Sequence, residues 1–161
     1  MGTNPEFTLA TFDVGGGGTA PALPSRIANF ESLANVKPSL TREVVFAMQG
    51  QMGGARFLID GKQFDPNRID VKVTKGTTED WLIRNTSPMD HPFHLHVWPF
   101  QVIEPAPNAK SPAGWKDVVN IPANSSVRVR IPFVGITGKT VFHCHILDHE
   151  DLGMMAIIDV S

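Results

Sequence analysis

The sequence predicts an all-β fold, in the form of a β-sandwich or barrel. Between Thr41 and Ser161, short runs of alternating apolar and polar residues are separated by turn signals, which is the pattern of many short strands. No amphipathic helix of ordinary length appears in this range. Tyr is absent, while Phe, Val, Ile, Thr, Gly and Pro are plentiful, and this composition favours strands joined by turns.

The chain divides into three expected parts. Its 161 residues suffice for one domain with a substantial core. We interpret residues 1–7 (MGTNPEF) as a remnant of cloning, because they carry no periodicity and join abruptly to the next segment. Residues 8–40 contain the glycine run Gly15–Gly18 and several prolines, so we expect an irregular linker or extension that allows one short helix around Ser25–Asn35. The folded domain is expected over residues 41–161.

Each strand of this domain is expected where residues alternate with period two or form a short apolar run. Asp60-Gly61 is a dipeptide preferred in tight hairpins, so we expect Arg56–Ile59 and Lys62–Phe64 to flank a turn. Residues 105–116, rich in Pro, Ala and Lys, are expected to form a loop. The other expected strands are Glu43–Met48, Ile69–Val73, Glu79–Asn85, His94–Trp98, Val118–Ile121, Val127–Ile131, Thr140–Ile146 and Met155–Val160.

Two of these strands predict the direction of particular side chains. Leu95 and Val97 alternate with histidines, so both apolar side chains are expected to point inward and the imidazoles to share the other face. Arg128 and Arg130 alternate with Val and Ile and are expected on a solvated face.

Charge and composition exclude several functions. The formal net charge of -2 offers no basic surface for nucleic acid. The longest apolar runs are far shorter than the roughly 20 residues that span a bilayer, so we expect no membrane partner. One cysteine cannot form an internal disulfide, and between two histidines it is better interpreted as a ligand or nucleophile.

All six histidines and the sole cysteine lie in two short segments, His91–His96 and Val141–Met155. If Thr140–Ile146 is a strand, Cys144 shares one face with apolar neighbours, while His143 and His145 share the other face. The strand would therefore serve two different sites, one towards the core and one on the surface.

The inward site would collect Cys144 with His149 and Met154, and His91 can complete it because it lies at an odd offset from His94. Two imidazoles, one thiolate and a long axial thioether are the ligands of a blue-copper electron-transfer centre. Zinc is a weaker interpretation, since thioethers bind it poorly and structural zinc sites use more thiolates.

The outward face would collect four imidazoles that suit copper, with zinc as the alternative: His94, His96, His143 and His145. Taken alone, a His-X-His pair on a strand is commonly a surface feature, and a lone cysteine in an apolar strand is commonly a core residue. Neither a surface pair nor a core cysteine explains why all six histidines lie in two short segments, because chance would scatter them along the chain. The metal interpretation explains their concentration.

These motifs resemble the two C-terminal copper motifs of multicopper oxidases, the laccase-like enzymes. The resemblance covers roughly Thr41–Val160 and looks like the last cupredoxin domain of a bacterial member, which implies a cupredoxin-like Greek-key β-sandwich or barrel. It implies His91, Cys144 and His149 as type 1 copper ligands, and it selects Met154 rather than Met155 as the axial ligand.

The resemblance also implies roles at the outward site. His94 matches a type 2 copper ligand, and His96, His143 and His145 match ligands of the paired type 3 coppers. Glu150 matches an acidic residue that relays protons towards bound oxygen in some bacterial laccases, although a solvent-exposed loop carboxylate is the simpler alternative. In the family, electrons from a substrate enter at type 1 copper and pass through cysteine and its neighbouring histidines to a trinuclear cluster that reduces dioxygen to water.

The family's cluster needs eight histidines, and this chain can supply only four of them. We therefore expect a type 1 copper domain with half a trinuclear site, whose oxidase activity needs an N-terminal cupredoxin domain or another copy of the chain. The alternatives are a self-assembled active oxidase and a standalone blue-copper electron carrier. The resemblance implies a small-molecule electron donor and a periplasmic or extracellular location, for which this chain carries no signal of its own.

Overall fold

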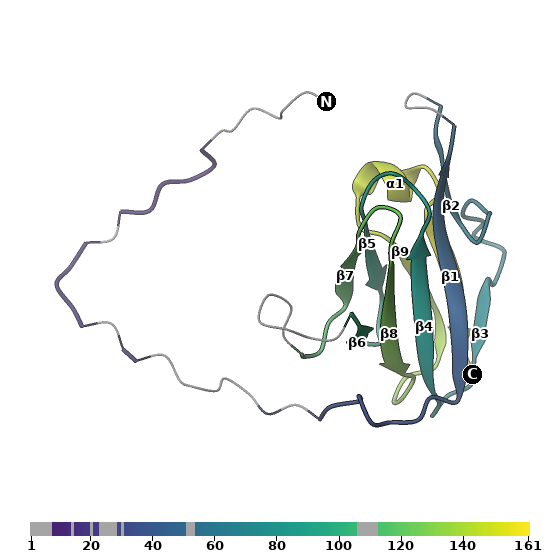
Figure 1. Ribbon diagram of the computed structural model, residues 1–161, viewed down its shortest axis with the longest axis horizontal. Helices are drawn as coiled ribbons and strands as arrows, with labels where there is room; N and C mark the ends of the chain where they lie inside the picture. Colours follow the sequence, from purple (N-terminus) through teal and green to yellow (C-terminus); the bar gives the residue numbers. More distant parts are fainter. Residues whose placement is uncertain are drawn as a thin grey trace.

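The computed structural model describes residues 8–13, 15–19, 21–22, 29, 31–50, 54–105 and 113–161. Within these residues, ten strands form two sheets packed face to face, and one short helix, α1 (Leu147–Asp151), lies at one end of the sandwich (Figure 1). The first sheet has the order β2-β1-β4-β8-β6 and the second has the order β3-β10-β9-β5-β7. Their bounds are β1 Leu40–Gln49, β2 Arg56–Ile59, β3 Val71–Val73, β4 Thr78–Asn85, β5 His91–Leu95, β6 Gln101–Glu104, β7 Val118–Ile121, β8 Ser126–Pro132, β9 Gly138–Cys144 and β10 Met155–Val160.

The all-β, cupredoxin-like sandwich predicted from the sequence is confirmed. Strand pairing is antiparallel except between β1 and β4 and between β3 and β10, which run parallel. Residues along β10 alternate between half-buried and buried, as period-two patterning requires. Strands β2, β7 and β10 have the bounds expected from the sequence.

Aromatic side chains fill the space between the sheets. Trp81 of β4 is fully buried, and its ring meets that of Phe142 of β9 edge-on, with 5.2 Å between centroids. Phe46 and Phe93 are also fully buried and meet edge-on at 6.1 Å. These contacts join β1 and β4 of one sheet to β5 and β9 of the other, so the strands that carry the metal motifs are anchored in the core.

Two details of the strand predictions are wrong. Val97 is 51% exposed and has a positive φ of 74°, so β5 ends at Leu95 and the chain turns before Val97 can point inward. Lys62–Phe64 is not a strand: Asp60 and Gly61 do form a tight turn with φ values of 51° and 75°, but only Ile59 and Lys62 pair across it. Strand β2 pairs instead with β1.

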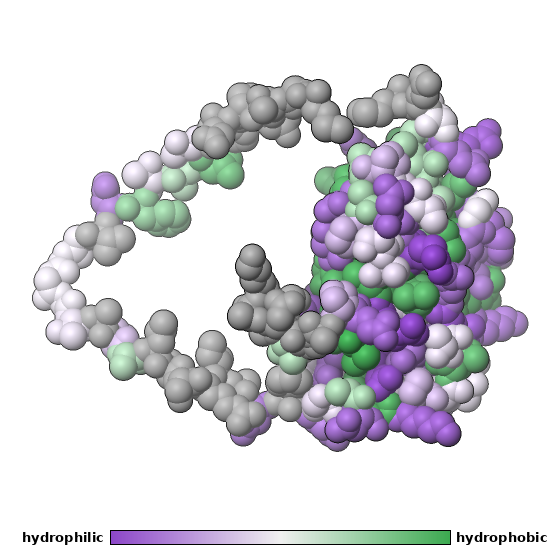
Figure 2. Space-filling view, in the orientation of Figure 1, coloured by the Kyte–Doolittle hydropathy of each residue, from purple (hydrophilic) through white to green (hydrophobic). Residues whose placement is uncertain are grey.

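Other segments also differ from expectation. The sequence did not predict β6, which pairs with β8 across a register shift. The described residues of the helix expected around Ser25–Asn35, namely 29 and 31–35, contain no helix, and the rest of that segment lies outside the described residues. Residues 106–112, within the loop expected at 105–116, also lie outside them. The described residues between 8 and 22 are exposed and contain no helix or strand, and Figure 2 shows hydrophobic residues among them.

The prediction that Arg130 is solvated is wrong, because its side chain is buried. Its guanidinium forms two hydrogen bonds with the Asp80 carboxylate, at 2.6 and 2.8 Å. Its Nη1 atom also donates to the carbonyl oxygens of Leu33, Ala34 and Val36. Arg130 therefore fastens the segment that precedes β1 to the first sheet.

No helix in the part of the chain that the structure describes is long and apolar enough to cross a membrane.

Candidate metal centre

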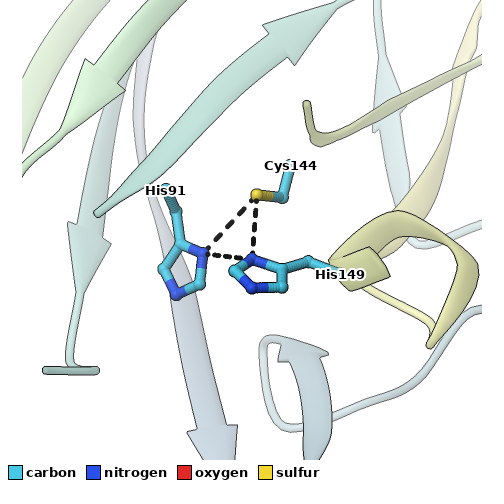
Figure 3. A group of neighbouring side chains, drawn as sticks. All are labelled: His91, Cys144 and His149. Atoms are coloured by element: carbon cyan, nitrogen blue, oxygen red, sulfur yellow. Dashed lines mark hydrogen bonds between the residues drawn. The ribbon is translucent and has the colours of Figure 1, made fainter. Parts of the chain in front are cut away.

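Three buried side chains meet at the end of the sandwich next to α1. His91 begins β5, Cys144 ends β9 and His149 lies in α1. The two histidine Nδ1 atoms are 3.1 Å apart, and each is 3.5 Å from Cys144 Sγ (Figure 3). The structure thus brings together three residues that the sequence predicted for one inward site.

Backbone contacts fold the segment after β9 over this site. The amide of Cys144 donates to the carbonyl oxygen of Met154, and the amide of Met154 donates to that of His149. The Met154 side chain is fully buried. The loop is braced from outside by Gln63 Nε2, which donates to Leu152 O at 2.9 Å. Met154, the fourth predicted ligand, is therefore joined through its backbone to both Cys144 and His149.

Each histidine of the inward site has a second partner that fixes its ring. The Nε2 atom of His91 is 2.7 Å from the Oγ atom of Ser87, which is itself buried. The ring of Phe57 stacks on that of His149 with 4.0 Å between centroids and 18° between planes. The sequence prediction missed both Ser87 and Phe57, since neither belongs to a motif.

Burial keeps the three donors uncharged in the metal-free protein. Burial, and then the neighbouring His149, lower the pKa of His91 to about 4. Burial also lowers the pKa of His149, and it raises the pKa of the Cys144 thiol to about 11. Two neutral imidazoles are ready to bind a metal, whereas the thiol must release its proton when one binds.

The donor set fits copper. A buried thiol and two imidazole nitrogens within 3.5 Å of one another, beside a buried thioether side chain, match the soft and imidazole ligands of a type 1 copper site. These residues would hold the metal between β5, β9 and α1, shielded from water. A hollow of ≈ 320 Å³, lined by Met48, Met89 and Asp148 among others, reaches His149 and Phe57 from the outside.

Four more histidines gather on the opposite face of β5 and β9. Ligand atoms of His94, His96 and His143 lie within 4.8 Å of one another, with 3.0 Å between the Nε2 atoms of His96 and His143. His145 is exposed, and its ring centroid is 5.3 Å from that of His94. The predicted outward cluster is therefore assembled, and its donors suit copper or zinc.

Glu150 belongs to this second cluster. Its carboxylate oxygen is 3.1 Å from His143 Nδ1, and it sits in α1 directly after His149. It is half-buried rather than freely exposed. It can accept a hydrogen bond from the imidazole or hold a proton at the edge of the cluster. Helix α1 therefore contributes His149 to the inward site and Glu150 to the outward cluster.

The pKa of His91 predicts a pH-dependent stability of the metal-free protein. The folded state holds this imidazole neutral down to about pH 4, whereas the unfolded chain takes up a proton near pH 6.5. The free energy of unfolding should therefore fall as pH drops from about 6.5 towards 4, by at most about 1.4 kcal/mol per pH unit. Urea titrations across this range measure it. His91→Asn is the comparison, and equal pH slopes for both proteins would contradict the prediction.

Residues 37–161 match a family model described as multicopper oxidase. The multicopper oxidase mco of Staphylococcus aureus is 41% identical over 111 residues, covering 64% of this chain and 24% of that protein. A laccase of Bacillus subtilis is 32% identical over 160 residues, covering 86% of this chain and 31% of that protein. The chain thus spans about a quarter to a third of the length of these relatives.

Solved structures give the same result. A multicopper oxidase from Campylobacter jejuni, described as a metallo-oxidase, superimposes with a TM-score of 0.75 at 31% identity, covering 88% of this chain and 34% of that one. A laccase from Pediococcus acidilactici superimposes with a TM-score of 0.75 at 36% identity, covering 89% of this chain and 31% of that one. Each similarity concerns one part of a longer protein.

Proposed function

The chain belongs to the multicopper oxidase family, and on this premise we propose that it is the family's type 1 copper electron-transfer domain, carrying half of a trinuclear copper site. One observation carries the proposal. Strand β9 presents Cys144 to the buried pair His91 and His149, and its neighbour His143 to the outward cluster. Adjacent residues on one strand point to opposite faces, so the two sites are joined by a single peptide unit.

Each part of the chain has a defined task in this function. His91 and His149 would hold copper through Nδ1, Cys144 would hold it as a thiolate, and Met154 would be the fourth ligand. Copper would supply the one-electron chemistry at this site. The hollow beside His149 admits a small-molecule donor, with apolar and thioether side chains on its walls. In a complete enzyme, such a donor would be a phenol or a metal ion, and dioxygen would be reduced to water.

The outward cluster needs imidazoles from elsewhere. Its histidines, His94, His96, His143 and His145, are half of the eight that a trinuclear site requires. An N-terminal cupredoxin domain is the partner that the family relationship favours. The exposed His145 favours a second candidate, in which another copy of this chain supplies the missing ligands and assembles an active oxidase.

Copper loading tests the proposal. We expect Cu²⁺ to give the intense blue thiolate-to-copper absorption band and the matching EPR signal, and Cys144→Ser to abolish both while the protein stays folded. His145→Gln is the matched control: it should keep the band and lower only the additional copper bound per chain. A loaded protein without the band, or a Cys144→Ser variant that retains it, would overturn the proposal.

The same samples separate the alternatives. One copper per chain, with no copper at the histidine face, would support a standalone electron carrier. Oxygen consumption with a phenol or cuprous donor that rises with protein concentration would support self-assembly. If no oxygen is consumed at any protein concentration or copper loading, a partner domain would be the source of the missing ligands.

A further inference from the structure

Ser87 lies behind His91, on the side of the imidazole opposite Cys144. Its Oγ atom is 2.7 Å from His91 Nε2, whereas His91 Nδ1 faces Cys144 Sγ at 3.5 Å. Ser87 is 1% exposed and His91 is 0% exposed. Water is therefore excluded from this contact, and the hydrogen on the imidazole must be placed by the protein alone.

Asn85 determines which groups around Ser87 accept hydrogen bonds. Its Nδ2 atom lies 2.7–3.1 Å from the carbonyl oxygens of Met89, Ile121 and Pro122, which can only accept. The side-chain NH₂ group must face them. The Oδ1 atom of Asn85 therefore faces Ser87, where it accepts from the backbone N–H at 2.9 Å and from Oγ at 2.8 Å.

The Ser87 hydroxyl hydrogen is thereby directed away from His91. Asn85 Oδ1 and the carbonyl oxygen of Met89, at 3.1 Å from Oγ, are both acceptors for it. Oγ then offers a lone pair to His91 Nε2, and the 2.7 Å contact requires that Nε2 carries the hydrogen. A neutral imidazole protonated at Nε2 keeps its free lone pair at Nδ1, which is the atom that faces Cys144 and His149.

We propose that Ser87, oriented by Asn85, is a positioning residue that holds His91 in the one tautomer and ring orientation able to bind a metal through Nδ1. This inference rests on the proposed function, in which His91 is a copper ligand. A histidine that is already oriented loses little freedom when it binds a metal, and groups that orient ligands in this way typically contribute about 10–100-fold to metal affinity.

Nitrogen-15 NMR of the metal-free protein tests the tautomer directly. We expect the wild type to carry the His91 hydrogen on Nε2, and Ser87→Ala to populate both tautomers because the acceptor is gone. The wild-type measurement needs neither copper nor a stable variant, so it is independent of the proposed function. A wild-type His91 with its hydrogen on Nδ1 would overturn the inference.

Copper affinity tests the consequence. In competition with a chelator for Cu²⁺, Ser87→Ala should bind about 10–100-fold more weakly than wild type and show a displaced blue band. Thr86→Val is the matched control: it removes a neighbouring hydroxyl that donates to Phe46 O at 3.2 Å, and it should leave affinity and band unchanged.

The outcomes distinguish the two proposals. A blue wild type with a folded Ser87→Ala variant of equal affinity would overturn the role of Ser87 and leave the type 1 site intact. A wild type that never turns blue would overturn the proposed function, and the tautomer measurement would then decide the role of Ser87.

Discussion

Replacing Arg130 by Leu is expected to lower the free energy of unfolding by about 3–5 kcal/mol, because it leaves the Asp80 carboxylate buried without its partner. The side chains of Arg130 and Asp80 are only 8% and 7% exposed. The same substitution removes the donor to the carbonyl oxygens of Leu33, Ala34 and Val36. Urea denaturation of wild type and variant measures the loss.

Two further variants show whether the loss comes from the unpaired charge. Arg84→Leu removes an exposed ion pair with Glu43 on the same sheet, and it should cost less than about 1 kcal/mol. Adding Asp80→Leu to Arg130→Leu removes the buried charge and should recover part of the stability. Equal small losses of unfolding free energy for Arg130→Leu and Arg84→Leu would show that the buried pair contributes no more to stability than the exposed one.

Gly153→Ala is expected to destabilise strongly the segment between Cys144 and Met154. Gly153 has a φ of 106°, a conformation that L side chains rarely adopt, and an added Cβ would lie 3.0 Å from Gln63 Cβ. The strained backbone and the close contact together should cost about 2–5 kcal/mol. Because Met154 follows directly, copper should also bind more weakly. Thermal unfolding and chelator competition measure the two effects.

Two other glycines separate the backbone effect from the steric one. Gly135 and Gly138 have φ values of 83° and 125°, on either side of that of Gly153, but a Cβ added at either position would meet nothing within 4 Å. Alanine there should cost only the backbone strain, about 1–2 kcal/mol, and leave copper binding unchanged. Equal losses at all three positions would exclude a contribution from the contact with Gln63.

The division of the metal motifs into two faces could be predicted from the sequence because it depends only on local geometry. On β9, period two separates Cys144 from its histidine neighbours, and the structure keeps that separation. The choice of Met154 rather than Met155 as a ligand followed from the resemblance rather than from periodicity. Helix α1 is too short to produce a helical pattern in the sequence.

The remaining features do not follow from strand patterning. Arg130 alternates with apolar residues like a surface residue, and only the docking of the segment around Leu33 buries it. Valine is a β-branched residue that prefers strands, yet Val97 adopts a positive φ just after the end of β5. Ser87 becomes informative only when Asn85 and His91 are seen beside it. None of these features follows from the alternation of apolar and polar residues along the chain.

Strand β9 has one more consequence for the proposed function. It pairs with β10 on one side and with β5 on the other, so Cys144 and His143 cannot shift relative to each other without breaking the sheet. Their Cα atoms are held about 3.8 Å apart by a single trans peptide. The covalent path between the two predicted ligand sets is thus fixed by the chain, and substitutions elsewhere cannot lengthen it. In the proposed function, variation among such domains would act on the driving force for electron transfer, through the surroundings of each metal, rather than on the length of this covalent path.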